Sequence, residues 1–167
     1  MDMIRAIVTQ VDEELSRLTD ERRSEDLPGL KPLEIKVLGQ MCLLMDPVGQ
    51  SLNPAATRDI DALLMGDLPA INIFRAVIKS HNLVFDELSK EIWLPDAAVF
   101  IPYHSSEHLI VSYLDSISAL TSKAIKAKEK NRYLIRRGLE VFGKPLEEAI
   151  VRYGGDINYF VAGKLRL

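Results

Sequence analysis

The spacing of apolar residues changes along the first quarter of the chain from a helical period to a strand period. Over residues 4–18 apolar side chains recur every three or four positions, with charged residues between them, which predicts an amphipathic helix. A polar segment then ends in Leu27-Pro28-Gly29, and helices rarely continue through such a pair. From Leu33 to Leu38 apolar and polar residues alternate, which predicts a strand. We therefore expect a helical arm and linker over residues 1–32.

Short apolar runs separated by turn-forming residues predict an α/β core over residues 33–115. The stretch 41–45 is wholly apolar and predicts a short buried helix, whereas 46–56 contains prolines, a glycine and an asparagine and predicts a loop. A helix is expected from Asp67, which can cap it, through Leu83. Further strands are expected at 59–65, 99–101 and 109–114.

The last third of the chain has a helical pattern. Apolar stripes begin at Ser116, a glycine follows at Gly143, and Gly154-Gly155 ends the last helix. We expect a C-terminal helical set over residues 116–167. The whole order predicts an α/β (α+β) fold with a small mixed sheet, flanking helices and this C-terminal set.

Composition narrows the function classes. The 167 residues include 21 Lys and Arg and 24 Asp and Glu, so the formal net charge is −3, which is unlike a protein that binds nucleic acid through bulk charge. The single cysteine, Cys42, excludes an internal disulfide and a cysteine zinc cluster, and its apolar neighbours predict a core residue. There is no apolar run of about 18 residues and no signal-peptide core. We expect a cytoplasmic protein with no membrane partner.

The most informative motif is a pair of acidic residues two positions apart. On a strand, Asp59 and Asp61 would project from the same face while Ile60 points into the core. Two carboxylates held close together repel each other unless a cation lies between them, and their hard oxygen atoms suit Mg²⁺. The alternative interpretation of the pair alone is a solvated strand edge with two exposed acids.

The order of motifs around this pair resembles a known superfamily. A predicted strand ends at Gly39-Gln40, a short apolar helix follows, and Arg58-Asp59-Ile60-Asp61 lies on the next strand. Trp93-Leu94-Pro95, Leu120-Thr121-Ser122-Lys123 and a basic stretch over 130–135 come later. This order resembles the nucleotidyltransferase fold of the DNA polymerase beta-like superfamily. It is most similar to a bacterial nucleotidyltransferase-like family related to abortive-infection toxins.

The resemblance implies a site and a reaction. Gly39 and Gln40 would line a nucleoside triphosphate, Arg58 and Lys123 would belong to the same nucleotide-binding set, and Asp59 and Asp61 would hold Mg²⁺. The implied reaction transfers a nucleotidyl group to a hydroxyl of an RNA or protein acceptor. The implied partners also include a toxin–antitoxin partner or a second copy of the chain.

Departures from the family pattern favour a second hypothesis. Gln40 stands where the family has a second small residue, and the strand expected at 109–114 has no third carboxylate, although Glu107 and Asp115 flank it. Asn131 and Leu134 stand where relatives have acids. The alternative function is a catalytically degenerate relative that acts by nucleotide binding or protein–protein contact, for example within a toxin–antitoxin system.

Two other motifs admit two interpretations each. His104-Ser105-Ser106-Glu107-His108 matches a zinc-peptidase pattern that works only on a helix, and its serines, the preceding Pro102 and the β-rich run that follows favour a polar loop. Between 123 and 137 seven Lys and Arg residues form a basic cluster. That cluster is either a solvated helix face or a surface facing phosphate or RNA, with Tyr133 available for stacking.

Overall fold

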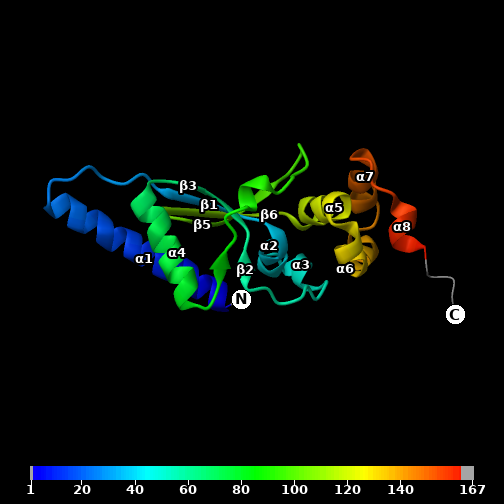
Figure 1. The fold of residues 1–167 in the computed structure, drawn as a ribbon, viewed down its shortest axis with the longest axis horizontal. Coiled ribbons are helices and arrows are strands. Elements are labelled where there is room, and N and C mark those ends of the chain that lie inside the picture. Colours follow the sequence, from blue (N-terminus) through cyan, green and yellow to red (C-terminus); the bar gives the residue numbers. More distant parts are fainter. Residues whose placement is uncertain (1, 163–167) are drawn as a thin grey trace.

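The computed structural model describes residues 2–162 as a mixed α/β fold drawn out along one axis (Figure 1). Within these residues there are eight α-helices: α1 (Asp2–Ser24), α2 (Gly39–Met45), α3 (Pro47–Gln50), α4 (Leu68–Ser80), α5 (Ser116–Lys126), α6 (Lys128–Phe142), α7 (Lys144–Arg152) and α8 (Ile157–Val161). The strands are β1 (Leu33–Val37), β2 (Asp59–Ile60), β3 (Ala62–Met65), β4 (Val84–Phe85), β5 (Phe100–Ser105) and β6 (Leu109–Leu114). A 3-10 helix, η1 (Ser89–Glu91), lies between β4 and β5.

A four-stranded sheet with the order β3-β1-β6-β5 forms the base of the core. One of its two inner strands, β1, runs parallel to β6 and antiparallel to β3, so the sheet is mixed. Along β1 the side chains of Leu33, Ile35 and Val37 are buried. On the opposite face Glu34 and Lys36 form an ion pair with an Nζ–Oε1 distance of 3.1 Å. The alternation in the sequence therefore determines which face of the sheet receives the helices.

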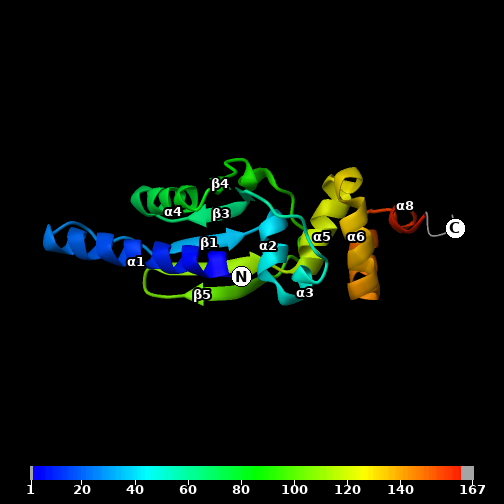
Figure 2. The same ribbon diagram turned by 90° about the horizontal axis from the view of Figure 1, so that it is seen from below.

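Helices α1 and α4 pack together and cover the buried face of this sheet (Figures 1 and 2). The stripe predicted for the first helix is buried at Ile7, Val11 and Leu15, and Phe74 and Ile78 of α4 belong to the same core. The N-terminal helix is therefore a layer of the α/β core, and residues 25–32 are the segment that returns the chain to β1.

Two histidine contacts hold α1 on the core. His104 Nε2 lies 2.7 Å from Asp12 Oδ2, and His81 Nε2 lies 3.0 Å from Gln10 Oε1. Ser106 donates a hydrogen bond to the other oxygen of Asp12. The histidine-rich motif thus lies on the β5–β6 hairpin and not on a helix. The peptidase alternative is wrong, because that chemistry needs both imidazoles on one helical face.

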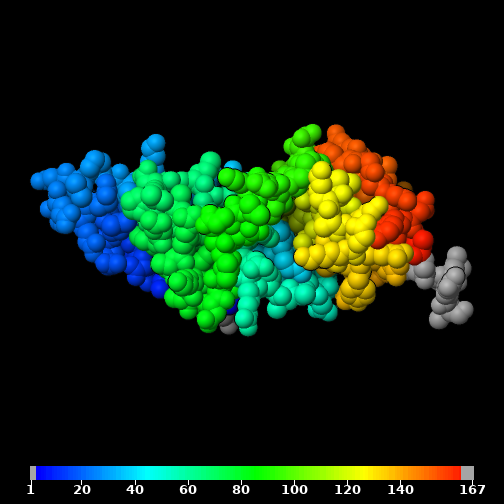
Figure 3. Space-filling model, in the orientation of Figure 1, coloured from blue at the N-terminus to red at the C-terminus, as the bar shows by residue number. Residues whose placement is uncertain are grey.

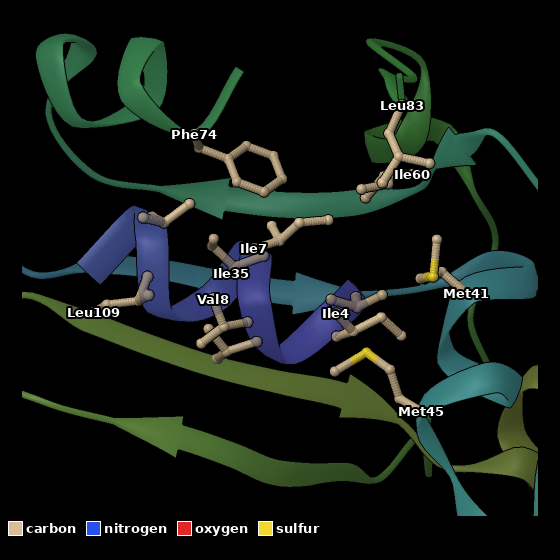
Figure 4. A pocket seen from close by; sticks show the side chains of 13 residues that line it. Ile4, Ile7, Val8, Ile35, Met41, Met45, Ile60, Phe74, Leu83 and Leu109 are labelled. Carbon is tan, nitrogen blue, oxygen red and sulfur yellow. The ribbon is translucent and has the colours of Figure 1, made fainter. Parts of the chain in front are cut away.

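An apolar cavity of about 40 Å³ lies between α1, α4, α2 and the sheet (Figure 4). Its walls are entirely aliphatic, aromatic or thioether side chains, so nothing in it would hold a water molecule in place. Ile4, Ile7 and Val8 of α1 form one wall, and Met41 of α2 and Ile60 of β2 form another. The core is therefore less tightly filled beneath the first turns of α1 than elsewhere.

A second sheet consists only of β2 and β4, which run parallel. Asp59 pairs with Val84, and Ile60 pairs with Phe85. After Ile60 the chain leaves this small sheet and enters β3 of the large one, so Asp61 lies where the two sheets meet. The single strand predicted over 59–65 is two strands, and the helix predicted to reach Leu83 ends at Ser80, before β4.

The C-terminal helices form a separate layer beyond the ends of β1 and β6 (Figures 1 and 2). Helix α5 contacts α2, α6 and α7, and it therefore joins this layer to the α/β core. Leu120, Ile135, Leu146, Ile150 and Phe160 are fully buried where the helices meet. The helices predicted from Ser116 onward are present, and the last of them is followed by α8.

The mixed α/β class predicted from the sequence is confirmed. The segment predicted as a loop over 46–56 is mostly irregular but contains α3, whose first turn is capped by Asp46 through the amide of Val48. Within residues 2–162 no helix combines the length and the apolar character needed to cross a membrane.

Candidate functional site

A cleft of about 1160 Å³ lies between the α/β core and the C-terminal helices. Its walls come from the start of α2, the loop 52–57, the ends of β2, β4 and β6, residues 91–94, and the facing sides of α5 and α6. In Figure 3 the green and cyan surfaces of the core meet the yellow surface of α5 and α6 on the visible face. The cleft is large enough for a substrate of nucleotide size together with part of a second one.

Four carboxylates line the core side of this cleft: Glu91, and three that lie at the ends of β2 and β4. Asp59 and Asp61 both face it, while Ile60 between them is buried and lines the apolar cavity behind. Asp86, which the sequence did not single out, lines the cleft as well. It follows β4 as Asp61 follows β2, and the amide of Asp86 donates to the carbonyl of Ile60 at 3.0 Å. The parallel pairing of two very short strands therefore brings Asp86 beside Asp61.

Burial and the neighbouring carboxylates disfavour the ionised form of Asp61. Partial burial raises the pKa of this carboxyl, and the neighbouring Asp86 raises it further by repulsion and by a hydrogen bond between the two carboxyl groups. Lys123 acts in the opposite direction, and Asp59 adds a smaller repulsion. A cation bound in the cleft would relieve this repulsion, which is the electrostatic pattern expected of a metal-binding or proton-holding pair.

Gly39 makes room for the Asp61 carboxylate. Its φ is +63°, in the left-handed region, and a Cβ atom at this position would lie 1.8 Å from Asp61 Oδ2. The resemblance implied that this glycine lines a nucleoside triphosphate. In the structure, the group that lies where a Gly39 side chain would begin is the carboxylate of Asp61, the candidate metal ligand. Gly39 still lines the cleft.

The other two residues predicted beside the nucleotide differ in their placement. Gln40 lines the cleft, but its side-chain amide donates to the carbonyl of Ala55 at 3.2 Å, which holds the loop 52–57 against α2. Arg58 is exposed and is not among the residues that line the cleft. Arg58 lies in the bend that precedes β2.

Lysines from α5 and α6 form the opposite wall. Lys123, Lys126 and Lys130 all line the cleft. Burial lowers the pKa of Lys123, and the nearby Asp61 partly compensates by attraction. Lys123 therefore lies across the cleft from the carboxylates. Trp93 and Tyr133 also line the cleft, and Lys126 Nζ lies 5.7 Å from the centre of the Trp93 ring.

The arginines of the basic cluster have another role. Arg132 and Arg136 donate to the carbonyls of Ala162 and Phe160 at the end of α8, at 2.7 and 2.9 Å. Arg137 donates to the carbonyl of Ser51. These contacts satisfy carbonyl groups near helix ends, where cations are favourable. The cluster is thus divided between lysines that face the cleft and arginines that hold neighbouring segments in place.

The donor set fits Mg²⁺ bound together with a substrate better than a metal held by protein alone. Within the described residues no group of three or more His, Cys, Asp or Glu side chains is arranged to hold a metal ion. Mg²⁺ commonly takes only one or two carboxylates and completes its octahedral shell with phosphate oxygens and water. Asp59 and Asp61, on an open cleft, offer that kind of incomplete oxygen set.

Cys42 is a core residue, as predicted. It is fully buried, its thiol lies 3.2 Å from the carbonyl of Gly39, and burial raises its pKa to about 12. A thiol of this kind carries almost no thiolate at neutral pH and is not a nucleophile.

Comparison of the chain with protein-family models, with curated proteins and with solved structures finds no match. The geometry of the cleft is therefore the basis on which its chemistry is assigned.

Proposed function

We propose that the chain is a Mg²⁺-dependent nucleotidyltransferase of the cytoplasm that uses the cleft between the α/β core and the C-terminal helices. One observation carries the proposal: carboxylates on one wall face lysines on the other across a single cleft. A nucleoside triphosphate needs both, because its phosphates attract the lysines and its metal ion needs carboxylate oxygens. The resemblance of the motif order to nucleotidyltransferases supports the same assignment.

Each group of cleft residues would have a separate role in the proposed reaction. Mg²⁺, when bound through Asp59 and Asp61, would neutralise negative charge on the phosphates. Lys123 and its neighbours on α5 and α6 would hold the phosphate chain. The acceptor hydroxyl oxygen would bond to the α-phosphorus as the α–β phosphoanhydride bond breaks and pyrophosphate leaves with that electron pair. Asp86 would accept the hydroxyl proton, since it lines the cleft beside Asp61 and is not one of the two carboxylates assigned to the metal.

Calorimetry with each of the four ribonucleoside triphosphates in Mg²⁺ tests binding. We expect a dissociation constant between about 1 μM and 1 mM, the usual range for enzyme substrates. Asp61→Asn should weaken binding at least about tenfold, which is the loss of one charge-assisted contact. Asp96→Asn is the matched control, because Asp96 is exposed and does not line the cleft.

Transfer is tested separately with triphosphates labelled at the α-phosphate. Label should pass to an RNA or a protein supplied as acceptor, and the reaction should require Mg²⁺ and Asp59. Label that stays with free nucleotide for both acceptor classes would remove the transferase. Absence of triphosphate binding by the wild-type chain would remove the nucleotide site as a whole.

A second candidate function is nucleotide binding without transfer, coupled to contact with a partner protein such as the other member of a toxin–antitoxin pair. Asn131 favours it: this residue lines the cleft on the lysine wall, where an acid would supply further base chemistry, and its side-chain amide donates instead to the carbonyl of Ala127. Binding of triphosphate with no transfer of label would select this candidate.

A further inference from the structure

Ser89 is the most deeply buried polar residue next to the acidic wall of the cleft. Its side chain is 1% exposed, and it is the first residue of η1, three residues after Asp86. Its hydroxyl donates to the carbonyl of Asp86 at 2.5 Å and accepts the amide hydrogen of Ala62 at 3.1 Å. One hydroxyl therefore joins the segment after β4 to the first residue of β3.

The same two segments are joined on the other side of Asp61. The amide of Asp86 donates to the carbonyl of Ile60 at 3.0 Å. Asp61 is thus bracketed: the residue before it and the residue after it are both tied to the main chain of Asp86, the first directly and the second through Ser89. Two carboxylates that repel each other are thus held side by side by one main-chain hydrogen bond and by the hydroxyl of Ser89.

The side chain of Asp86 is also fixed locally. Its Oδ1 accepts the amide of Leu88 at 2.9 Å, and the amide of Ser89 donates to its carbonyl at 3.0 Å. These contacts shape the turn after β4 but do not reach the main chain around Asp61. The hydrogen bonds of Ser89 to Ala62 and of Asp86 to Ile60 link that turn to the residues on either side of Asp61.

We propose that Ser89 is a positioning residue that sets the separation between the Asp61 and Asp86 carboxylates, and thereby the affinity of the cleft for a divalent cation. The proposal deepens the proposed function and rests on it for the cation. Its geometric part, the enforced closeness of the two carboxylates, is independent of any ligand. Removal of the hydroxyl would break the link on one side of Asp61 and let the two charges move apart.

The first test uses unfolding by urea at pH 7 in EDTA, so that no metal contributes. Asp61→Asn should lower the unfolding equilibrium constant about fivefold by removing the repulsion, a coupling typical of residues in contact. In a Ser89→Ala background the same substitution should lower it no more than about twofold, because the charges are already apart. An equal effect of Asp61→Asn in both backgrounds overturns the proposal.

Matched variants keep this test decisive. Thr19→Ala removes a buried hydroxyl that donates to the carbonyl of Leu15 within α1, and the effect of Asp61→Asn should be unchanged in that background. If Ser89→Ala does not fold, Ser89→Cys replaces it. The thiol keeps a weak donor and acceptor, so the reduction should have the same sign and a smaller size.

The second test measures binding of Mn²⁺ alone by electron paramagnetic resonance, with folded protein verified in each sample. Ser89→Ala should weaken Mn²⁺ binding about tenfold while Thr19→Ala leaves it unchanged. Equal affinity in the wild type and Ser89→Ala overturns the cation part of the proposal. If the wild type binds no Mn²⁺, the proposed metal chemistry fails, and the unfolding comparison still decides the geometric role of Ser89.

Discussion

The carboxylate of Asp61 lies in the space that any side chain at Gly39 would need. A Cβ atom on Gly39 would lie 1.8 Å from Asp61 Oδ2 and 2.7 Å from its Cγ. The main chain is tied at the same place, because the amide of Leu38 donates to the carbonyl of Asp61 at 2.7 Å. The start of α2 and the end of β2 are thus fitted to each other at the acidic wall of the cleft.

Gly39→Ala should therefore damage both stability and the site. The positive φ alone costs an alanine about 1–2 kcal/mol, and the new methyl group would also push the Asp61 carboxylate aside. We expect the free energy of unfolding to fall by about 2–4 kcal/mol and triphosphate binding to be lost in the protein that remains folded. Urea unfolding and calorimetry measure the two effects.

Gly154→Ala is the control for that substitution. Gly154, which follows the end of α7, also has a positive φ, of +83°, but a Cβ atom there would meet nothing within 4 Å. It should cost only about 1–2 kcal/mol and leave triphosphate binding intact. Equal losses of stability and equal binding in the two variants would mean that the Asp61 carboxylate simply moves away.

Asp61→Asn should make the protein more stable at pH 7 in the absence of metal. The folded-state pKa of Asp61 is raised above its ordinary value of 3.8, so the folded state resists ionisation more than the unfolded state does. Its contribution is therefore most favourable below the unfolded pKa and is lost as the pH rises through the folded pKa. The stability gained by Asp61→Asn should grow from about pH 4 to pH 7 and reach about 1 kcal/mol.

Urea unfolding of both proteins across that pH range, in EDTA, measures the difference. Asp96→Asn, at an exposed position, should show no such pH-dependent gain. A variant at position 61 that is less stable than the wild type at pH 7 would mean that attraction by Lys123 outweighs burial and the repulsion from Asp86.

The features that depend on local periodicity were predictable from the sequence. Alternation at 33–38 identified β1, and the two-residue spacing of Asp59 and Asp61 correctly placed Ile60 in the core. The close approach of the Asp61 carboxylate to Gly39 was not predictable, because it depends on where β2 ends relative to α2. A residue type at a turn can be read locally, whereas the group that approaches it is decided by the fold.

Asp86 and the arginines show why other site features were missed. Asp86 follows a strand of only two residues, and that strand is defined by pairing with β2, which precedes it by the whole of β3 and α4. The one local indication of this strand is the apolar run Leu83-Val84-Phe85, which stands between Asn82 and Asp86. Asn82 adopts a positive φ in the structure, as is common at turns. The sequence left the basic cluster open between a solvated helix face and a phosphate-facing surface. It did not predict the contacts of Arg132 and Arg136, because their partners are carbonyl groups, which no sequence pattern reveals.

The division of the basic cluster gives opposite expectations for two neighbouring cations. Lys130→Gln should weaken triphosphate binding about three- to tenfold with little change in stability, since this exposed lysine lines the cleft. Arg136→Gln should lower the free energy of unfolding by about 1 kcal/mol and leave binding unchanged, since its Nε donates to Phe160 at the end of α8. The same loss of binding in both variants would mean that the lysines and arginines of the cluster form one phosphate-facing surface.

The cavity beneath α1 should be fillable with a gain in stability. Val8 lines it, and a further methylene at this position would extend into a void of about 40 Å³ (Figure 4). At about 24 cal/mol per Å³, complete filling is worth at most about 1 kcal/mol, or a rise in Tm of about 2–4 °C for a chain of this size. Val8→Ile should approach that rise in a thermal melt followed by circular dichroism.

Val151→Ile on α7, at a side chain that is 56% exposed, should leave Tm unchanged. A lower Tm for Val8→Ile would mean that the added group strains α1 instead of entering the void, because the helix is already held in place by its contacts with His81 and His104.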